Sequence, residues 1–163
     1  FAYTGISSIV AAKAGAKVTH VDSSYSSIGW AKENQKASGL PLDSIRWIED
    51  DAIKFCEREL KRGAKYDAIM MDPPAYGHGP KGETWDFNES FPRLMNICIK
   101  LLSSTPLFFL VNTYAISSSS LMLENVLRDY FKEGNIESGE LAIKEKNSDR
   151  LLSTGIFAHW SNS

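Results

Sequence analysis

The sequence predicts an α/β fold in which one mostly parallel sheet carries helices on both faces and ends in an antiparallel C-terminal hairpin. Short β-branched or apolar segments alternate with segments of helical periodicity, at the spacing of βαβ units. Residues 107–111 are apolar throughout, which is typical of a central strand. The last two strand-like segments are only about ten polar residues apart, too few for a crossover helix, so they should pair antiparallel.

The first half of the chain should contain four strands and three helices. Ser23 or Ser24 is expected to cap the second helix and Asp51 the third, because both residue types accept hydrogen bonds from free helical amides. Gly15 and Gly63 should end the first and third helices. We expect strands at 1–4, 17–21, 45–48 and 66–71, and helices at 7–14, 24–38 and 51–62.

The second half should begin with a polar, glycine-rich loop at 77–85. Five apolar residues then recur at helical spacing between 123 and 131, and Gly134-Asn135 should end that helix. We expect helices at 89–102 and 123–131, and strands at 107–111, 137–144 and 155–160.

Composition favours one intracellular domain. The chain has 163 residues, 43% of them hydrophobic, with a net charge of −2 and a pI near 5.9, so bulk charge gives no support for nucleic-acid binding. Cys56 and Cys98 show no metal-like spacing and are expected in the core. His20 and His159 lie inside predicted strands and are expected to be structural; no metal is predicted. No segment resembles a membrane span or signal peptide, so we expect a soluble, cytoplasmic protein.

The chain opens inside a strand-like segment without an initiator methionine. We therefore expect residues 1–163 to be one domain of a longer protein, cut inside or just before its first strand.

An acid-Pro-Pro-x-aromatic cluster directly follows the predicted strand at 66–71. Asp72 should lie at the carboxyl end of that strand, where open α/β sheets bind ligands. Pro73 and Pro74 fix φ and lack amide donors, so their carbonyls are expected to be free acceptors beside the ring of Tyr76. Such a site suits a planar group that bears an amine, such as a nucleobase; a purely structural turn is the alternative.

Acids also follow the second and third predicted strands. Asp22 could accept hydrogen bonds from both hydroxyls of a ribose, and Asp51 from an adenine amine, although either could instead cap a helix. Gly5 lies at the first strand-to-helix turn, where backbone approaches a ligand. Gly5 is the only glycine in that turn, so the G-x-G-x-x-G fingerprint is absent, which argues against a dinucleotide.

The loop at 77–85 imitates a phosphate-binding P-loop. Gly77 and Gly82 have the required spacing, but Glu83 occupies the lysine position, so we reject that interpretation. The loop is better interpreted as a lid over the reacting group, where His78 and Lys81 could contact a substrate phosphate or simply be solvated.

The chain resembles the class I S-adenosylmethionine-dependent methyltransferases, which have a Rossmann-like sheet. The resemblance rests on four motifs in this order: Phe-Ala-Tyr-Thr-Gly, Val-Asp-Ser-Ser, Asp-Asp-Ala and Asp-Pro-Pro-Ala-Tyr. The branch it is most similar to is the bacterial ribosomal-RNA cytosine-5 methyltransferases. The resemblance covers nearly the whole chain and implies an RNA-binding or substrate-binding region upstream of it. It also implies roles for the motif residues. Tyr3, Thr4 and Gly5 are expected near the methionine part, Asp22 and Ser23 at the ribose, and Asp51 and Ala52 at the adenine. Asp72, Pro73 and Tyr76 are expected at the substrate as catalytic residues, with Asp72 also bordering the cofactor.

The chain departs from the cytosine-5 enzymes at one position. Their catalytic cysteine lies just after the fifth strand, where this chain has Tyr114, and carbon-5 chemistry requires that thiolate. Transfer to nitrogen requires only an aligned lone pair. We therefore expect a methyltransferase that acts on a nucleobase in RNA, with ribosomal RNA as the favoured acceptor. The alternatives are a protein or small-molecule amine as acceptor, a non-catalytic adenosine-ligand or RNA-binding module, and an NAD-dependent oxidoreductase.

Overall fold

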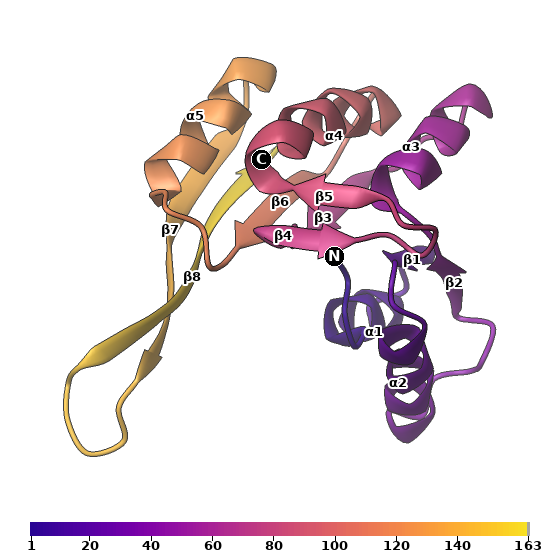
Figure 1. Cartoon of the computed structure of the whole chain (residues 1–163), viewed down its shortest axis with the longest axis horizontal. Coiled ribbons are helices and arrows are strands. Elements are labelled where there is room, and N and C mark those ends of the chain that lie inside the picture. Colours follow the sequence, from indigo (N-terminus) through magenta and orange to yellow (C-terminus); the bar gives the residue numbers. More distant parts are fainter. Residues whose placement is uncertain (163) are drawn as a thin grey trace.

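The computed structural model describes residues 1–162, and within them five helices cover two faces of the strands (Figure 1). Helices α1 and α2 lie on one side and α3, α4 and α5 on the other, which confirms the predicted arrangement. The helices are α1 Ile6–Lys13, α2 Tyr25–Ala37, α3 Ala52–Lys61, α4 Phe87–Leu101 and α5 Ser120–Tyr130. The strands are β1 Val18–Asp22, β2 Ile45–Glu49, β3 Ala68–Met71, β4 Tyr76–His78, β5 Thr84–Asp86, β6 Phe108–Thr113, β7 Asn135–Lys144 and β8 Leu151–Ser161.

The strands form a mixed arrangement whose parallel part comes first in the chain. Strand β1 pairs in parallel with β2, and a second sheet has the order β3-β6-β8-β7. In that sheet β3 is parallel to β6, whereas β8 runs antiparallel to both β6 and β7. The predicted C-terminal hairpin and the interior position of residues 107–111 are therefore confirmed. Within the described residues the expected single sheet is instead three hydrogen-bonded groups, the third being the pair β4-β5.

The strand expected at residues 1–4 does not form, and this prediction was wrong. The N-terminal amine and the amides of Ala2 and Tyr3 all donate to one carboxylate oxygen of Asp22, at 3.1, 3.1 and 2.9 Å. Tyr3 also has a φ of 50°, outside the extended region. Backbone donors that point at a side chain are not available to a strand ladder, so the segment is a turn.

The polar segment at 77–85 is also more ordered than expected. It forms an antiparallel hairpin, β4-β5, in place of an irregular loop. The amide of Gly79 donates to the carbonyl of Glu83 at 2.8 Å, and Gly82 supplies a φ of 82° in the turn. Trp85 is only 5% exposed and anchors the hairpin on the body of the protein.

The main core lies between the four-stranded sheet and helices α4 and α5. Phe109 and Leu127 are fully buried there, and Phe131 stacks on Trp160 at 4.0 Å between ring centroids. Burial of apolar surface of this kind is the dominant stabilising contribution to folding. This core fixes the end of β6, which carries part of the site described below.

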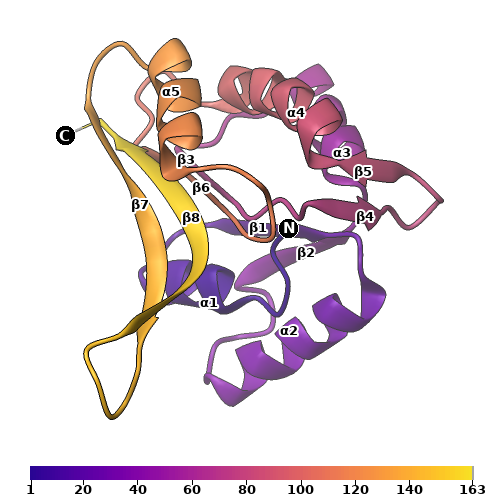
Figure 2. The same ribbon diagram turned by 60° about the vertical axis from the view of Figure 1, so that its left-hand side comes forward.

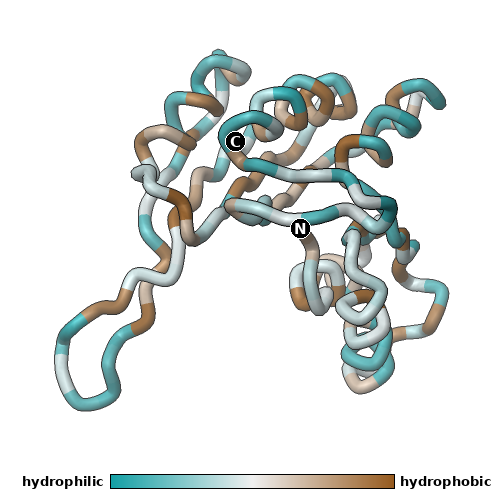
Figure 3. Tube along the Cα trace, in the orientation of Figure 1, coloured by the Kyte–Doolittle hydropathy of each residue, from teal (hydrophilic) through white to brown (hydrophobic). Residues whose placement is uncertain are grey.

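Strands β7 and β8 continue past the end of β6 as a two-stranded arm. The last pair between β6 and β8 joins Thr113 to Ile156, whereas β7 and β8 pair as far as Lys144 and Leu151. The arm projects from the body of the protein (Figures 1 and 2). Figure 3 shows apolar positions on both of its strands and a hydrophilic tip.

Candidate functional site

The predicted site residues gather at the carboxyl ends of the parallel strands. Asp22 ends β1, Asp72 follows β3, and Thr113 ends β6. The N-terminal segment connects these parts, because the Phe1 amine lies 3.1 Å from Asp22 while the Phe1 ring packs edge-on against Trp85 at 4.9 Å. Asp22 and Asp72 thus each lie at the carboxyl end of a parallel strand, and their joint role in one ligand site stays a prediction.

Asp22 organises the first turn. Besides the three donors on one oxygen, its other carboxylate oxygen accepts from the Ser24 amide at 2.8 Å. Burial opposes ionisation of the carboxylate, and the hydrogen bonds that it accepts from the amides of Tyr3 and Ser24 favour the ionised form. The contact of Asp22 and its neighbour Ser23 with a ribose stays a prediction. The ribose hydroxyls would donate to Asp22 oxygens that already accept hydrogen bonds from backbone amides.

Gly5 is required by its conformation and by its packing. Its φ is 80°, and an added Cβ would lie 2.9 Å from the Ala31 Cβ and 3.1 Å from the Trp47 ring. The turn is held further by Asn34, whose side-chain amide donates to the Thr4 carbonyl at 3.0 Å. The turn is thus fixed against α2 and β2, and the predicted contacts of Tyr3, Thr4 and Gly5 with the methionine part stay untested.

Asp51 is the N-cap of α3. Its Oδ1 accepts from the Lys54 amide at 2.8 Å, which confirms the predicted cap. The cap uses one carboxylate oxygen, so the other can still accept from an adenine amine, and Ala52 begins the helix beside it. The neighbouring Asp50 forms an ion pair with Arg58 and is a structural acid.

Asp72 differs from the other two acids because part of its carboxylate has no partner. Its Oδ1 is buried and makes no hydrogen bond to any residue in the described part of the chain. Burial raises the pKa of Asp72, and the N-terminal charge opposes that rise. A buried acceptor without a donor is costly in a folded protein, and such groups cluster at functional sites.

The two proline carbonyls after Asp72 already accept hydrogen bonds, so the expectation that they are free was wrong. Thr113 Oγ1 donates to the Pro73 carbonyl at 2.9 Å, and Trp85 Nε1 donates to the Pro74 carbonyl at 2.6 Å. Both donors are buried, at 1% and 5% exposure. Sequence reasoning missed both residues; the signal available was a tryptophan in an otherwise polar segment, since a buried indole N–H requires an acceptor.

The β4-β5 hairpin is tied to α3 next to this cluster. Glu83 forms an ion pair with Lys54 and accepts from the Lys81 amide at 2.8 Å. Tyr76 is 59% exposed and lies edge-on to the His78 ring, 5.3 Å between centroids. Its predicted role beside the substrate is compatible with that exposure and stays a prediction.

No thiol occupies the end of a strand in the part of the chain that the structure describes. Cys56 lies on α3 and Cys98 on α4, with their sulfur atoms 3.9 Å apart. Tyr114 follows β6 directly. Residues 1–162 also contain no cluster of three potential metal ligands, and no helix among them is long and apolar enough to cross a bilayer.

Comparison with known proteins relates the chain to methyltransferases, although no protein-family model matches it. The ribosomal RNA large subunit methyltransferase K/L of Shewanella sp. (strain MR-4) is 30% identical over 162 residues, which are 98% of this chain and 22% of that protein. The SAM-dependent methyltransferase from Agrobacterium tumefaciens superposes with a TM-score of 0.95 and is 44% identical. That alignment covers 100% of this chain and 54% of the other.

A more distant structure shows the same fold. It belongs to a protein assigned as a methyltransferase and solved with bound SAH, at a TM-score of 0.74 and 18% identity over 98% of this chain and 43% of the other. The chain therefore spans about a fifth of the Shewanella protein and about half of the Agrobacterium chain. The α/β methyltransferase-like fold predicted from the sequence is confirmed.

Proposed function

Because the chain is related over nearly its whole length to class I S-adenosylmethionine-dependent methyltransferases, we propose that it is a methyltransferase domain that transfers a methyl group to a nitrogen of a nucleobase. The observation that carries this proposal is the buried, unpartnered Oδ1 of Asp72 at the carboxyl end of β3. The anchored Gly5 turn and the carboxylates of Asp22 and Asp51 fit an adenosine-bearing cofactor at the neighbouring strand ends.

S-adenosylmethionine, when bound, supplies an electrophilic methyl group on a sulfonium. The role of the residues of this chain is to orient the acceptor. Asp72 accepts an N–H from the acceptor amine, which turns the nitrogen lone pair toward the methyl group, and positioning of this kind is the main contribution to such a transfer. Thr113 and Trp85 hold the Pro73 and Pro74 carbonyls, so the backbone that carries Asp72 is fixed before the acceptor arrives.

We propose ribosomal RNA as the acceptor and the cytoplasm as the place of the reaction. This proposal is supported by the Shewanella relative, whose name gives large-subunit ribosomal RNA as its substrate. The lack of a strand-end thiol among the described residues favours a nitrogen over cytosine carbon 5, so membership of a cytosine-5 branch has no mechanistic support here. A protein amide or a small-molecule amine is the second candidate, because it would satisfy Asp72 in the same way.

Calorimetry with S-adenosylmethionine, S-adenosylhomocysteine and NAD tests the cofactor. We expect micromolar binding of the first two and none of NAD. Asp51→Asn keeps a capping side chain and removes only the negative charge, so weaker binding by this variant with an unchanged Tm would locate the adenine contact.

The acceptor is tested by transfer of labelled methyl to an unmodified large-subunit rRNA transcript. We expect transfer by the wild-type protein and its loss in Asp72→Ala with cofactor binding retained. Binding of cofactor without any transfer to RNA, protein or small amines would instead identify a non-catalytic module. Binding of NAD alone would overturn the proposal.

A further inference from the structure

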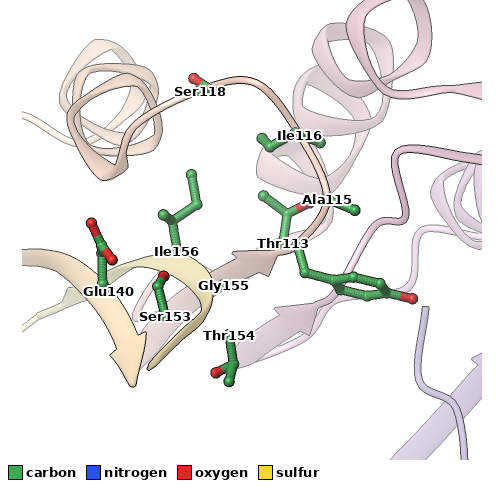
Figure 4. A pocket seen from close by; sticks show the side chains of 10 residues that line it. Thr113, Ala115, Ile116, Ser118, Glu140, Ser153, Thr154, Gly155 and Ile156 are labelled. Atoms are coloured by element: carbon green, nitrogen blue, oxygen red, sulfur yellow. The ribbon is translucent and has the colours of Figure 1, made fainter. Parts of the chain in front are cut away.

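A cavity of about 340 Å³ lies beside the acid-Pro-Pro cluster, between the end of β6 and the base of the β7-β8 arm (Figure 4). Its walls come from three places: the end of β6 and the segment after it, strand β7, and strand β8. The lining residues are Thr113, Tyr114, Ala115, Ile116, Ser118, Glu140, Ser153, Thr154, Gly155 and Ile156. It lies at the edge of the sheet where the parallel strands end, and the arm forms its far side.

The cavity shares one side chain with the proposed catalytic cluster. Thr113 lines it and also donates to the Pro73 carbonyl at 2.9 Å, so a ligand there would be one side chain away from the backbone that carries Asp72. Residues Thr113, Ile156 and Glu140 are aligned across β6, β8 and β7 by the strand register. The paired strands therefore hold one side of the cavity in register, and residues 114–118, which follow β6, form the other side.

Backbone strain marks the segment that closes the cavity. Ala115 has a φ of 57°, a conformation that side-chain-bearing residues rarely adopt, and such strain gathers at functional sites. On the opposite wall, a Cβ added to Gly155 would lie 2.9 Å from the Thr113 carbonyl. A side chain at position 155 would therefore collide with the end of β6, beside the cavity.

The lining is polar and carries one negative charge. Figure 4 shows the Glu140 carboxylate and the hydroxyls of Ser118 and Ser153 around the opening. A carboxylate only accepts hydrogen bonds at neutral pH, so it favours a ligand edge with N–H donors over one with carbonyl oxygens. The volume is at the lower end of the range for small-molecule sites and suits one base rather than a stack of several.

We infer that this cavity is the acceptor-base subsite and that Glu140 is its selectivity residue, favouring bases with an exocyclic amine over uracil. The inference rests on the proposed function, because it gives that reaction its acceptor pocket. Tyr114 follows the strand end as an exposed aromatic residue and supplies an apolar wall to the pocket.

Nucleoside titrations followed by NMR test the subsite without requiring methyl transfer. The probes are two matched pairs, cytidine with uridine and guanosine with inosine, in which one member carries an amine that the other lacks. The labelled protein is titrated with S-adenosylhomocysteine present and absent, and the amide signals of Ser153, Thr154 and Gly155 are monitored. We expect these signals to move with the amine-bearing member of at least one pair, at about three- to tenfold lower concentration than with its partner.

The variants separate selectivity from folding. Glu140 is exposed, so Glu140→Gln should fold normally, and it should abolish the discrimination within the pair because a glutamine amide can both donate and accept. Glu137→Gln changes an exposed acid on the same strand outside the cavity and should behave like the wild type. Absence of shifts at the cavity, equal shifts within both pairs, or discrimination that survives in Glu140→Gln would overturn the inference. Failure of cofactor binding in the calorimetry would instead count against the proposed function.

Discussion

Removal of the Thr113 hydroxyl should loosen the acid-Pro-Pro cluster and lower stability. Thr113→Val preserves the side-chain shape but deletes the donor to the Pro73 carbonyl, a bond of 2.9 Å between two fully buried groups. A buried carbonyl that loses its donor costs about 1–3 kcal/mol. For an unfolding slope in urea of about 2 kcal/mol per molar, the midpoint should fall by roughly 0.5–1.5 M.

The assay compares urea unfolding and methyl transfer for Thr113→Val and Thr113→Ser. Serine keeps the hydroxyl and loses one buried methyl, so it costs about 1 kcal/mol but should retain turnover. Valine should lower turnover as well, because the Asp72 backbone is no longer held. A valine variant with wild-type stability and turnover would refute the view that Thr113 positions the cluster.

Three further outcomes follow from the site and its supports. Burial lowers the pKa of His20 from 6.5 to about 4, so the folded protein favours the neutral imidazole. The free energy of unfolding, measured by urea titration, should therefore fall by up to about 3 kcal/mol between pH 7 and pH 4. His20→Gln should remove most of this pH dependence, and an equal pH dependence in both proteins would contradict the assignment. Burial raises the pKa of Asp72 in the folded protein, so the ionised carboxylate destabilises the fold at pH values above the pKa of an unfolded aspartate. Asp72→Asn should therefore raise the urea midpoint at pH 7.5 but not at pH 3, and it should abolish methyl transfer. A lower midpoint at pH 7.5 would contradict the effect of burial. Gly5→Ala should cost about 1–3 kcal/mol by thermal unfolding, more than Gly15→Ala, which has a similar φ of 90° but open space around it; equal losses would show that packing on Ala31 is unimportant.

Most of the order of elements could be predicted from the sequence because it follows from local patterns, whereas the strands β4 and β5 were expected as a loop. Helix caps at Ser24 and Asp51 and the apolar run of β6 are short-range signals. The turn at residues 1–4 could not be predicted in this way, since its extended-looking sequence is overridden by the carboxylate of Asp22, about twenty residues away.

The same limit applies to the site. The pattern of acids at strand ends selects Asp22, Asp51 and Asp72 as candidates, and their roles stay predictions. The hydrogen-bond partners of these acids and of the backbone beside them come from distant segments. N-terminal amides donate to Asp22, and Thr113 and Trp85 donate to the backbone next to Asp72. Periodicity carries no information on such contacts, so the lack of a partner on Asp72 is known only from the structure.

The Pro73-Pro74 pair has a consequence for the entropy of acceptor binding. Each proline ring restricts φ in the unfolded chain as well as in the folded one, so little backbone freedom is lost when this segment becomes ordered. The hydrogen bonds from Thr113 and Trp85 then restrict the freedom that remains. An acceptor that meets Asp72 therefore does not have to order the segment that binds it, and more of its interaction energy is retained as affinity.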